Sequence, residues 1–166
     1  MTVRPIRIFG DPVLRTEADP VTSFDKELRG LVADLEDTVR VPGRAGVAAP
    51  QIGVSLRVFS YNVAGQVGHL VNPVLSDFAG EQEDDEACLS LPGLGFPTRR
   101  AMSVTARGAD QHGERLVIRG TGLLARALQH ETDHLAGTLY IDTLTGDVRR
   151  QALRELRRVS PAPPSR

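Results

Sequence analysis

The sequence contains a pair of histidines whose spacing suits a shared metal ion. The pair belongs to His130-Glu131-Thr132-Asp133-His134, an H-E-x-x-H pattern. On a helix, four residues at about 100° each bring the second imidazole to within about 40° of the first. Glu131 lies one step round the helix, where it can reach a water on the ion and serve as general base. The pattern favours a hydrolytic metal site, and the alternative is an exposed helix whose histidines bind nothing.

A catalytic site of this kind typically takes three protein ligands and leaves one position open for water. Tyr140 occupies the place of the last histidine of a metzincin motif, so that family is excluded. Glu155 lies 21 residues after His134, as a thermolysin-like site would allow, although neighbouring arginines favour a solvated ion pair. Cys88 is the only cysteine, so it forms no internal disulfide and is either a small buried residue or a ligand. Spacing alone leaves both Glu155 and Cys88 open as the third ligand.

Three segments with helical periodicity must carry or support these residues. Residues 24–40 form an amphipathic pattern, and residues 121–136 contain the H-E-x-x-H pattern with Gly137 at the usual place of a C-terminal cap. Residues 146–159 have one apolar side, with five arginines elsewhere. The sequence therefore predicts an N-terminal helix, a central helix that carries the metal motif and a C-terminal helix.

Strand composition marks four segments between the first two helices: 56–63, 69–75, 102–107 and 115–119. The last two flank a turn cluster and predict a hairpin. The acidic stretch 81–86 is expected to be mostly a solvated loop. Because strands and helices do not alternate regularly, the pattern predicts an α+β fold, with mixed or antiparallel sheets packed around the central helix. We expect one catalytic domain over residues 1–160 and a frayed tail over residues 161–166.

The overall composition limits the classes of partner. A formal net charge of -1 is unlike that of a nucleic-acid-binding protein, so DNA is not expected as a partner. No apolar stretch approaches the roughly 20 residues that a membrane helix needs. The first thirty residues carry charges where a signal peptide would be apolar. We therefore expect a cytoplasmic protein that does not contact a membrane.

Three separated segments resemble the motifs of one enzyme family. Residues 45–51 read A-G-V-A-A-P-Q, residues 86–90 read E-A-C-L-S, and residues 129–134 read Q-H-E-T-D-H. They are similar to the G-x-G-L-A-A-x-Q, E-G-C-x-S and Q-H-E-x-D-H motifs of peptide deformylases, and their order and spacing also fit. The resemblance implies a hydrolase that removes the formyl group from the N-terminal formylmethionine of nascent polypeptides.

The same resemblance implies a role for each motif. One divalent metal ion is expected, ferrous iron in the cell with zinc or nickel as alternatives, and its ligands are Cys88, His130 and His134. Glu131 moves the proton during hydrolysis. Gln51 and the backbone N–H of Leu89 stabilise the charge that grows on the carbonyl oxygen.

The resemblance also implies a substrate pocket and a pair that supports the metal site. The pocket residues are expected to be Gly46, Ala87, Leu123 and Ala127. Arg126 reaches the rim of this pocket or faces solvent, and Arg100 pairs with Glu86 either behind the metal ligands or at the surface.

Two other functions remain open, and departures from the family pattern motivate the second of them. Arg44 and Ala87 stand where the motifs have glycine, and a methyl group at 87 resists a backbone φ above zero. One alternative is a zincin-type peptidase with Glu155 as third ligand. Another is a catalytically weak, ribosome-associated homologue whose basic C-terminal helix touches ribosomal RNA, although this helix face also suits simple solvation.

Overall fold

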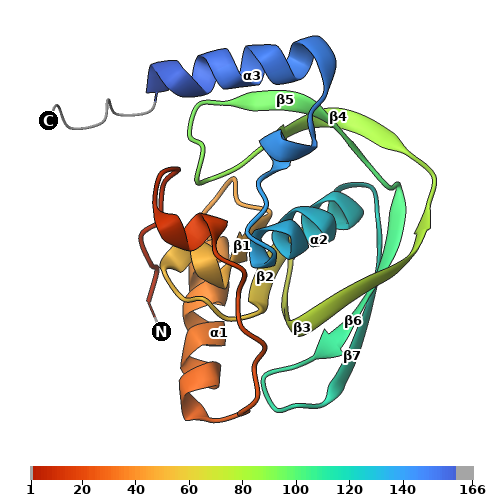
Figure 1. The fold of residues 1–166 in the computed structure, drawn as a ribbon. Coiled ribbons are helices and arrows are strands. Elements are labelled where there is room, and N and C mark those ends of the chain that lie inside the picture. The colour runs from red at the N-terminus through yellow and green to blue at the C-terminus, as the bar shows by residue number, and fades with distance from the viewer. Residues whose placement is uncertain (1, 160–166) are drawn as a thin grey trace, which may run out of the picture.

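The structure is a computed structural model that describes residues 2–159 (Figure 1). The expected frayed tail, residues 161–166, lies outside the described residues. The three helices are α1 (Lys26–Val39), α2 (Gly122–Leu135) and α3 (Gly146–Val159). The strands are β1 (Gly46–Ala48), β2 (Val58–Val63), β3 (Gln66–Ala79), β4 (Gln82–Ala87), β5 (Gly95–Arg100), β6 (Ser103–Ala109) and β7 (Arg115–Thr121). All three predicted helices are therefore present.

The strands form two antiparallel units. Five of them make one sheet in the order β1-β2-β3-β6-β7, while β4 and β5 make a separate two-stranded ribbon. β6 and β7 pair along their whole length and close through a turn in which the backbone N–H of Asp110 donates to Glu114 O. This confirms the predicted α+β class and the predicted hairpin.

Helix α1 begins at Asp25, whose side chain accepts a hydrogen bond from the backbone N–H of Leu28 at 3.0 Å. Its buried face, which includes Val32 and Leu35, packs with Val47 of β1 and Val58 of β2. This packing fixes the short edge strand β1 against the body of the sheet. Since β1 leads directly into the turn that carries Gln51, the N-terminal helix supports one wall of the site.

Helix α2 lies between the five-stranded sheet and the β4–β5 ribbon, and α3 lies on the far side of the ribbon (Figure 1). Toward the sheet, Leu128 and Leu135 are fully buried in a cluster with Phe59 and Leu70. A second cluster joins the ribbon and the segment around Cys88 to Tyr140 and to α3. The central helix is thus enclosed on both sides, as predicted for the helix that carries the metal motif.

The prediction of a solvated loop at residues 81–86 is wrong, because most of this stretch is strand β4. Glu86 lies opposite Phe96 and Ala87 lies opposite Gly95 in the ribbon. Two inward residues, Gln82 and Glu86, are buried. Both are polar, so the strand lacks the apolar alternation that normally reveals one. None of the described helices is both long and apolar enough to cross a membrane.

Candidate metal centre

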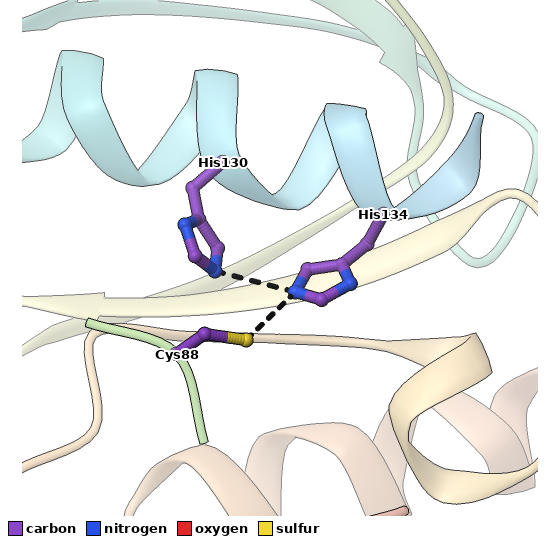
Figure 2. A group of neighbouring side chains, drawn as sticks. All are labelled: Cys88, His130 and His134. Carbon is purple, nitrogen blue, oxygen red and sulfur yellow. Dashed lines mark hydrogen bonds between the residues drawn. The ribbon is translucent and has the colours of Figure 1, made fainter. Parts of the chain in front are cut away.

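Three buried side chains from two elements meet at one point. Cys88, from the turn that follows β4, faces His130 and His134, which project from one face of α2 (Figure 2). The Cys88 Sγ atom lies 3.3 Å from His134 Nε2, and this nitrogen lies 3.2 Å from His130 Nε2. All three donor atoms lie within 4.8 Å of one another. One thiol and two imidazoles at this separation fit a divalent zinc-like or iron-like ion with an open position.

The protonation of the two imidazoles is strongly perturbed by their surroundings. Burial alone would lower the pKa of His130, but hydrogen bonds to Cys88 and Glu86 outweigh it and raise the pKa well above its usual value. Burial lowers the pKa of His134, and the charge on His130 lowers it further. An ion bound at this point would displace a proton from the His130 ring.

Glu86 is the centre of the hydrogen bonds behind His130. Its Oε2 accepts from His130 Nδ1 at 2.8 Å and from Arg100 Nη2 at 2.7 Å. Its Oε1 accepts from Arg100 Nε at 3.0 Å and from Arg126 Nη1 at 2.8 Å. Burial would raise the pKa of Glu86, but the bonds to His130 and Arg100 outweigh it and lower the pKa to about 2. An ionised carboxylate that accepts from Nδ1–H leaves the Nε2 of His130 free to bind a metal ion.

The expected pairing of Arg100 with Glu86 is present and buried, which excludes a surface pair. Arg100 also donates to Asp133 Oδ2 at 2.7 Å. For Arg126, the solvent-facing alternative is wrong, because the residue is only 6% exposed. It lines the cavity beside Cys88 and His130, but its guanidinium is bonded to Glu86 and to the carbonyl oxygen of Thr98. No local pattern in the sequence indicated the contacts of Glu86 with His130 and Arg126.

Glu131 lies in the same cavity, buried to 3% exposure and packed against the backbone of Gly46. A methyl group at Gly46 would lie 2.7 Å from both Cγ and Cδ of Glu131, and closer still to Oε1. Burial raises the pKa of Glu131 to about 7. Its Oε2 has no hydrogen-bond partner among the described residues. A carboxyl group with these properties is suited to exchange a proton near neutral pH.

Gln51 is held by a short 3₁₀ helix, Ala49–Ile52, directly after β1. Its Oε1 accepts from the backbone N–H of Ala48 at 2.9 Å, which fixes the orientation of the amide. The Nε2 group therefore points toward the centre, 3.2 Å from Ser90 Oγ and 3.8 Å from Cys88 Sγ. Leu89, the other predicted donor, lines the same cavity, and no group within residues 2–159 accepts a hydrogen bond from its backbone N–H.

A cavity of about 400 Å³ opens beside Cys88 and His130. All four predicted pocket residues line it: Gly46, Ala87, Leu123 and Ala127. Leu91 and Leu94 line it as well, and they were missed although they lie in an apolar run just after Cys88. Ala87 does not have a positive φ, so alanine causes no backbone strain where the family motif has glycine.

Glu155 does not join the three donors. It lies on α3 and accepts a hydrogen bond from Gln151 Nε2 at 2.9 Å, one turn earlier on the same helix. The group of potential metal ligands that the described residues form consists of Cys88, His130 and His134. The geometry therefore favours cysteine as the third donor. A helix with paired histidines and an adjacent buried glutamate, completed by a thiol, is an arrangement typical of metal-dependent hydrolases.

Comparisons with known proteins identify the family within this class. The family model for polypeptide deformylase matches residues 3–150. The peptide deformylase of Acidothermus cellulolyticus is 59% identical over 158 residues, which cover 95% of this chain and 87% of that protein. The crystal structure of a peptide deformylase from Legionella pneumophila is 41% identical, with a TM-score of 0.87 and 95% coverage of each chain. That of the Thermus thermophilus enzyme is 39% identical, with a TM-score of 0.88 and 94% coverage of each chain.

The chain belongs to the peptide deformylase family. This confirms the resemblance seen in the three sequence motifs and the prediction of a deformylating hydrolase. It also agrees with a metal-dependent centre, because the family is metal-dependent and the structure brings three suitable donors together.

Proposed function

We propose that the protein hydrolyses the formyl amide at the N-terminal formylmethionine of nascent polypeptides, with one divalent ion held by Cys88, His130 and His134. The observation that carries the proposal is the convergence of these three buried donors at the edge of a cavity that also contains Glu131. Residues 1–160 act as one catalytic domain in this proposal, and the packing of α2 against both the sheet and the ribbon supports it.

The proposed ion is ferrous iron in the cell, with zinc or nickel able to replace it. A soft thiolate beside two imidazoles accepts all three metals, so the donor set does not select one. When bound, such an ion supplies Lewis acidity, which makes a water molecule nucleophilic near neutral pH.

Glu131 moves the proton in the proposed reaction. As a water oxygen attacks the formyl carbon, Glu131 takes the proton that the water loses. When the C–N bond breaks, Glu131 returns this proton to the amine, so that formate and a free N-terminus are released. The partner-free Oε2 of Glu131 among the described residues and the raised pKa of this carboxyl group support the assignment.

Gln51 and Leu89 stabilise the negative charge that grows on the formyl oxygen. Because Oε1 of Gln51 is fixed by the backbone N–H of Ala48, its Nε2 is already aimed at the centre and needs little reorganisation. The backbone N–H of Leu89, which lines the same cavity, adds a second donor. Each donor of this kind typically contributes about 3 kcal/mol to the transition state.

The substrate chain binds in extended form between two strand edges. β1 is the edge of the five-stranded sheet, and β4 pairs on one side only, with β5. Gly46 of β1 and Ala87 of β4 both line the cavity, where an extended peptide can add its own backbone hydrogen bonds. The methionine side chain fills the apolar part of the cavity, which is lined by Leu91, Leu94 and Leu123.

The proposal is tested by deformylation of a formyl-Met-Ala-Ser peptide with anaerobically purified protein of measured metal content. Wild-type protein should release formate, and Glu131→Ala should lose nearly all activity while it keeps its metal. Glu155→Gln is the matched control, since this acidic residue on α3 lies outside the donor group, and it should behave as wild type. Absence of turnover in fully loaded wild-type protein would instead support the catalytically weak homologue.

We also propose that the protein contacts the ribosome through α3. Five arginines on this helix are exposed to solvent: Arg149, Arg150, Arg154, Arg157 and Arg158. Such a face can neutralise RNA phosphates, and the binding would weaken as salt rises. Cosedimentation with ribosomes at two salt concentrations tests it, with Arg154→Glu/Arg157→Glu as the variant. A nascent-chain substrate also implies that the enzyme works in the cytoplasm.

A further inference from the structure

Glu86 receives hydrogen bonds from three side chains, and two of them come from the same face of α2. Arg126 and His130 are four residues apart on this helix, so they lie one above the other. Arg126 Nη1 donates to Oε1 of Glu86, while His130 Nδ1 bonds to Oε2. The helix therefore contacts both oxygens of the carboxylate, and only one of these contacts involves a metal ligand.

We propose that Arg126 is a positioning residue for the metal centre: it fixes the carboxylate of Glu86 so that this group orients His130 with Nε2 turned toward Cys88 and His134. This inference rests on the proposed metal site. Arg126 itself touches neither the ion nor the reacting atoms. It acts through Glu86, and the effect reaches the ion through the ring of His130.

The position of Arg126 differs from that of Arg100, the other arginine on Glu86. Arg100 divides its guanidinium between Glu86 and Asp133 and comes from the end of β5. Arg126 instead uses its Nη1 twice, for Glu86 Oε1 at 2.8 Å and for the carbonyl oxygen of Thr98 at 2.9 Å. It thereby joins α2 to both strands of the ribbon that leads to the cysteine.

Because the contact between Arg126 and Glu86 is buried, its loss would be costly. Glu86 is 4% exposed and Arg126 is 6% exposed, so water cannot readily replace the lost donor if Arg126 is removed. Glu86 and Asp133 face Arg100, Arg126 and His130 in this cluster. Without Arg126, Oε1 of Glu86 would keep a single donor, the Nε of Arg100.

The experiment measures metal affinity directly. Metal-free wild type, Arg126→Met, Arg126→Gln and Arg126→Lys are titrated with Co²⁺ against a competing chelator, and the thiolate-to-cobalt absorption is followed. Removal of a group that orients a metal ligand typically costs about 10–100-fold in affinity, and Arg100 remains, so Arg126→Met should bind about tenfold more weakly. Lysine should restore much of the affinity, because one ammonium group can replace the single Nη1 that makes both bonds. Arg99→Met, on the exposed side of β5, is the matched control and should bind as wild type.

A second measurement separates positioning from a purely structural role. In zinc-loaded protein, ¹H–¹⁵N spectra of the imidazole of His130 should report a slowly exchanging Nδ1–H in wild type and a faster exchange in Arg126→Gln. Thermal unfolding of each metal-free variant shows whether it is folded, and affinities are compared for folded protein only. Should the methionine variant fail to fold, the glutamine variant, which is shorter and uncharged, decides the question, and it should also bind Co²⁺ more weakly than wild type.

Three outcomes would overturn the inference. Unchanged Co²⁺ affinity in folded Arg126→Met or Arg126→Gln would leave only a structural contact between helix and ribbon. If the Arg126 variants changed only KM, and did so for substrates that differ in their first side chain, Arg126 would be a residue of the substrate pocket. Failure of Arg126→Lys to restore Co²⁺ affinity would exclude the role proposed for the single Nη1 that bonds both Glu86 and Thr98. If wild type binds no Co²⁺ through its thiol, the proposed metal site itself fails, and this result is distinct from the other three.

Discussion

Replacement of Gly46 by alanine should displace the proposed general base without touching the metal ligands. The added methyl carbon would lie 2.7 Å from Cγ and Cδ of Glu131, whereas two carbon atoms pack at about 3.5–4.0 Å. Either the edge strand or the carboxyl group must therefore move by roughly 1 Å. A misplacement of this size at a reacting group can cost about 100-fold in rate, or ~2.7 kcal/mol of transition-state free energy.

The assay compares kcat, KM and bound metal for wild type and Gly46→Ala. We expect kcat to fall about 100-fold with metal content unchanged, because Gly46 meets Glu131 rather than a donor atom. Gly95→Ala is the matched control, since its methyl carbon would meet only Glu86 O at an ordinary 3.7 Å. In a Glu131→Ala background the Gly46→Ala change should cost almost nothing more, because its target is gone. Full kcat in Gly46→Ala, or an equal loss in both backgrounds, would refute the reasoning.

Cys88, Gln51 and Glu86 give three further tests of the site. Cys88→Ala should abolish stoichiometric metal binding, measured by elemental analysis after dialysis. Retained metal would instead support Glu155 as the third ligand. Gln51→Leu, close in shape but without a donor, should lower kcat about 100-fold with metal retained, and an unchanged kcat in a steady-state assay would remove Gln51 from the charge-stabilising role. The folded-state pKa of Glu86 is lowered from 4.5 to about 2, so its contribution to stability is complete above pH 4.5 and is lost as pH falls through 2. Urea unfolding of the metal-free protein should therefore show a loss of roughly 3 kcal/mol across this window, and a flat profile would contradict the Glu86 assignment.

Local patterns in the sequence were sufficient for the elements whose side chains repeat with a regular period. The spacing of apolar residues predicted α1 and α2 to within two residues at each end. The H-E-x-x-H pattern, being local to one helix, predicted that His130 and His134 share a face. The family resemblance added Cys88, which no rule of spacing could select over Glu155.

Other features depend on contacts between distant segments and could not be predicted from local patterns. β4 escaped detection because its inward residues, Gln82 and Glu86, are polar and are satisfied by partners far along the chain. The bond between Arg126 and Glu86 spans 40 positions and requires the register of the ribbon. The tight approach of Glu131 to Gly46 likewise exists only after α2 has packed beside β1.

The cysteine directly follows a ribbon of two strands, which has a consequence for the lifetime of the protein in the cell. Two strands alone have little stability in water. An ion that joins the segment after this ribbon to α2 therefore adds its binding free energy to the folding of this part of the chain. In cells starved of metal, the ribbon would open more often, and transiently opened chains are the ones that proteases cleave. The supply of metal would then determine how long each protein molecule survives as well as how fast it hydrolyses its substrate.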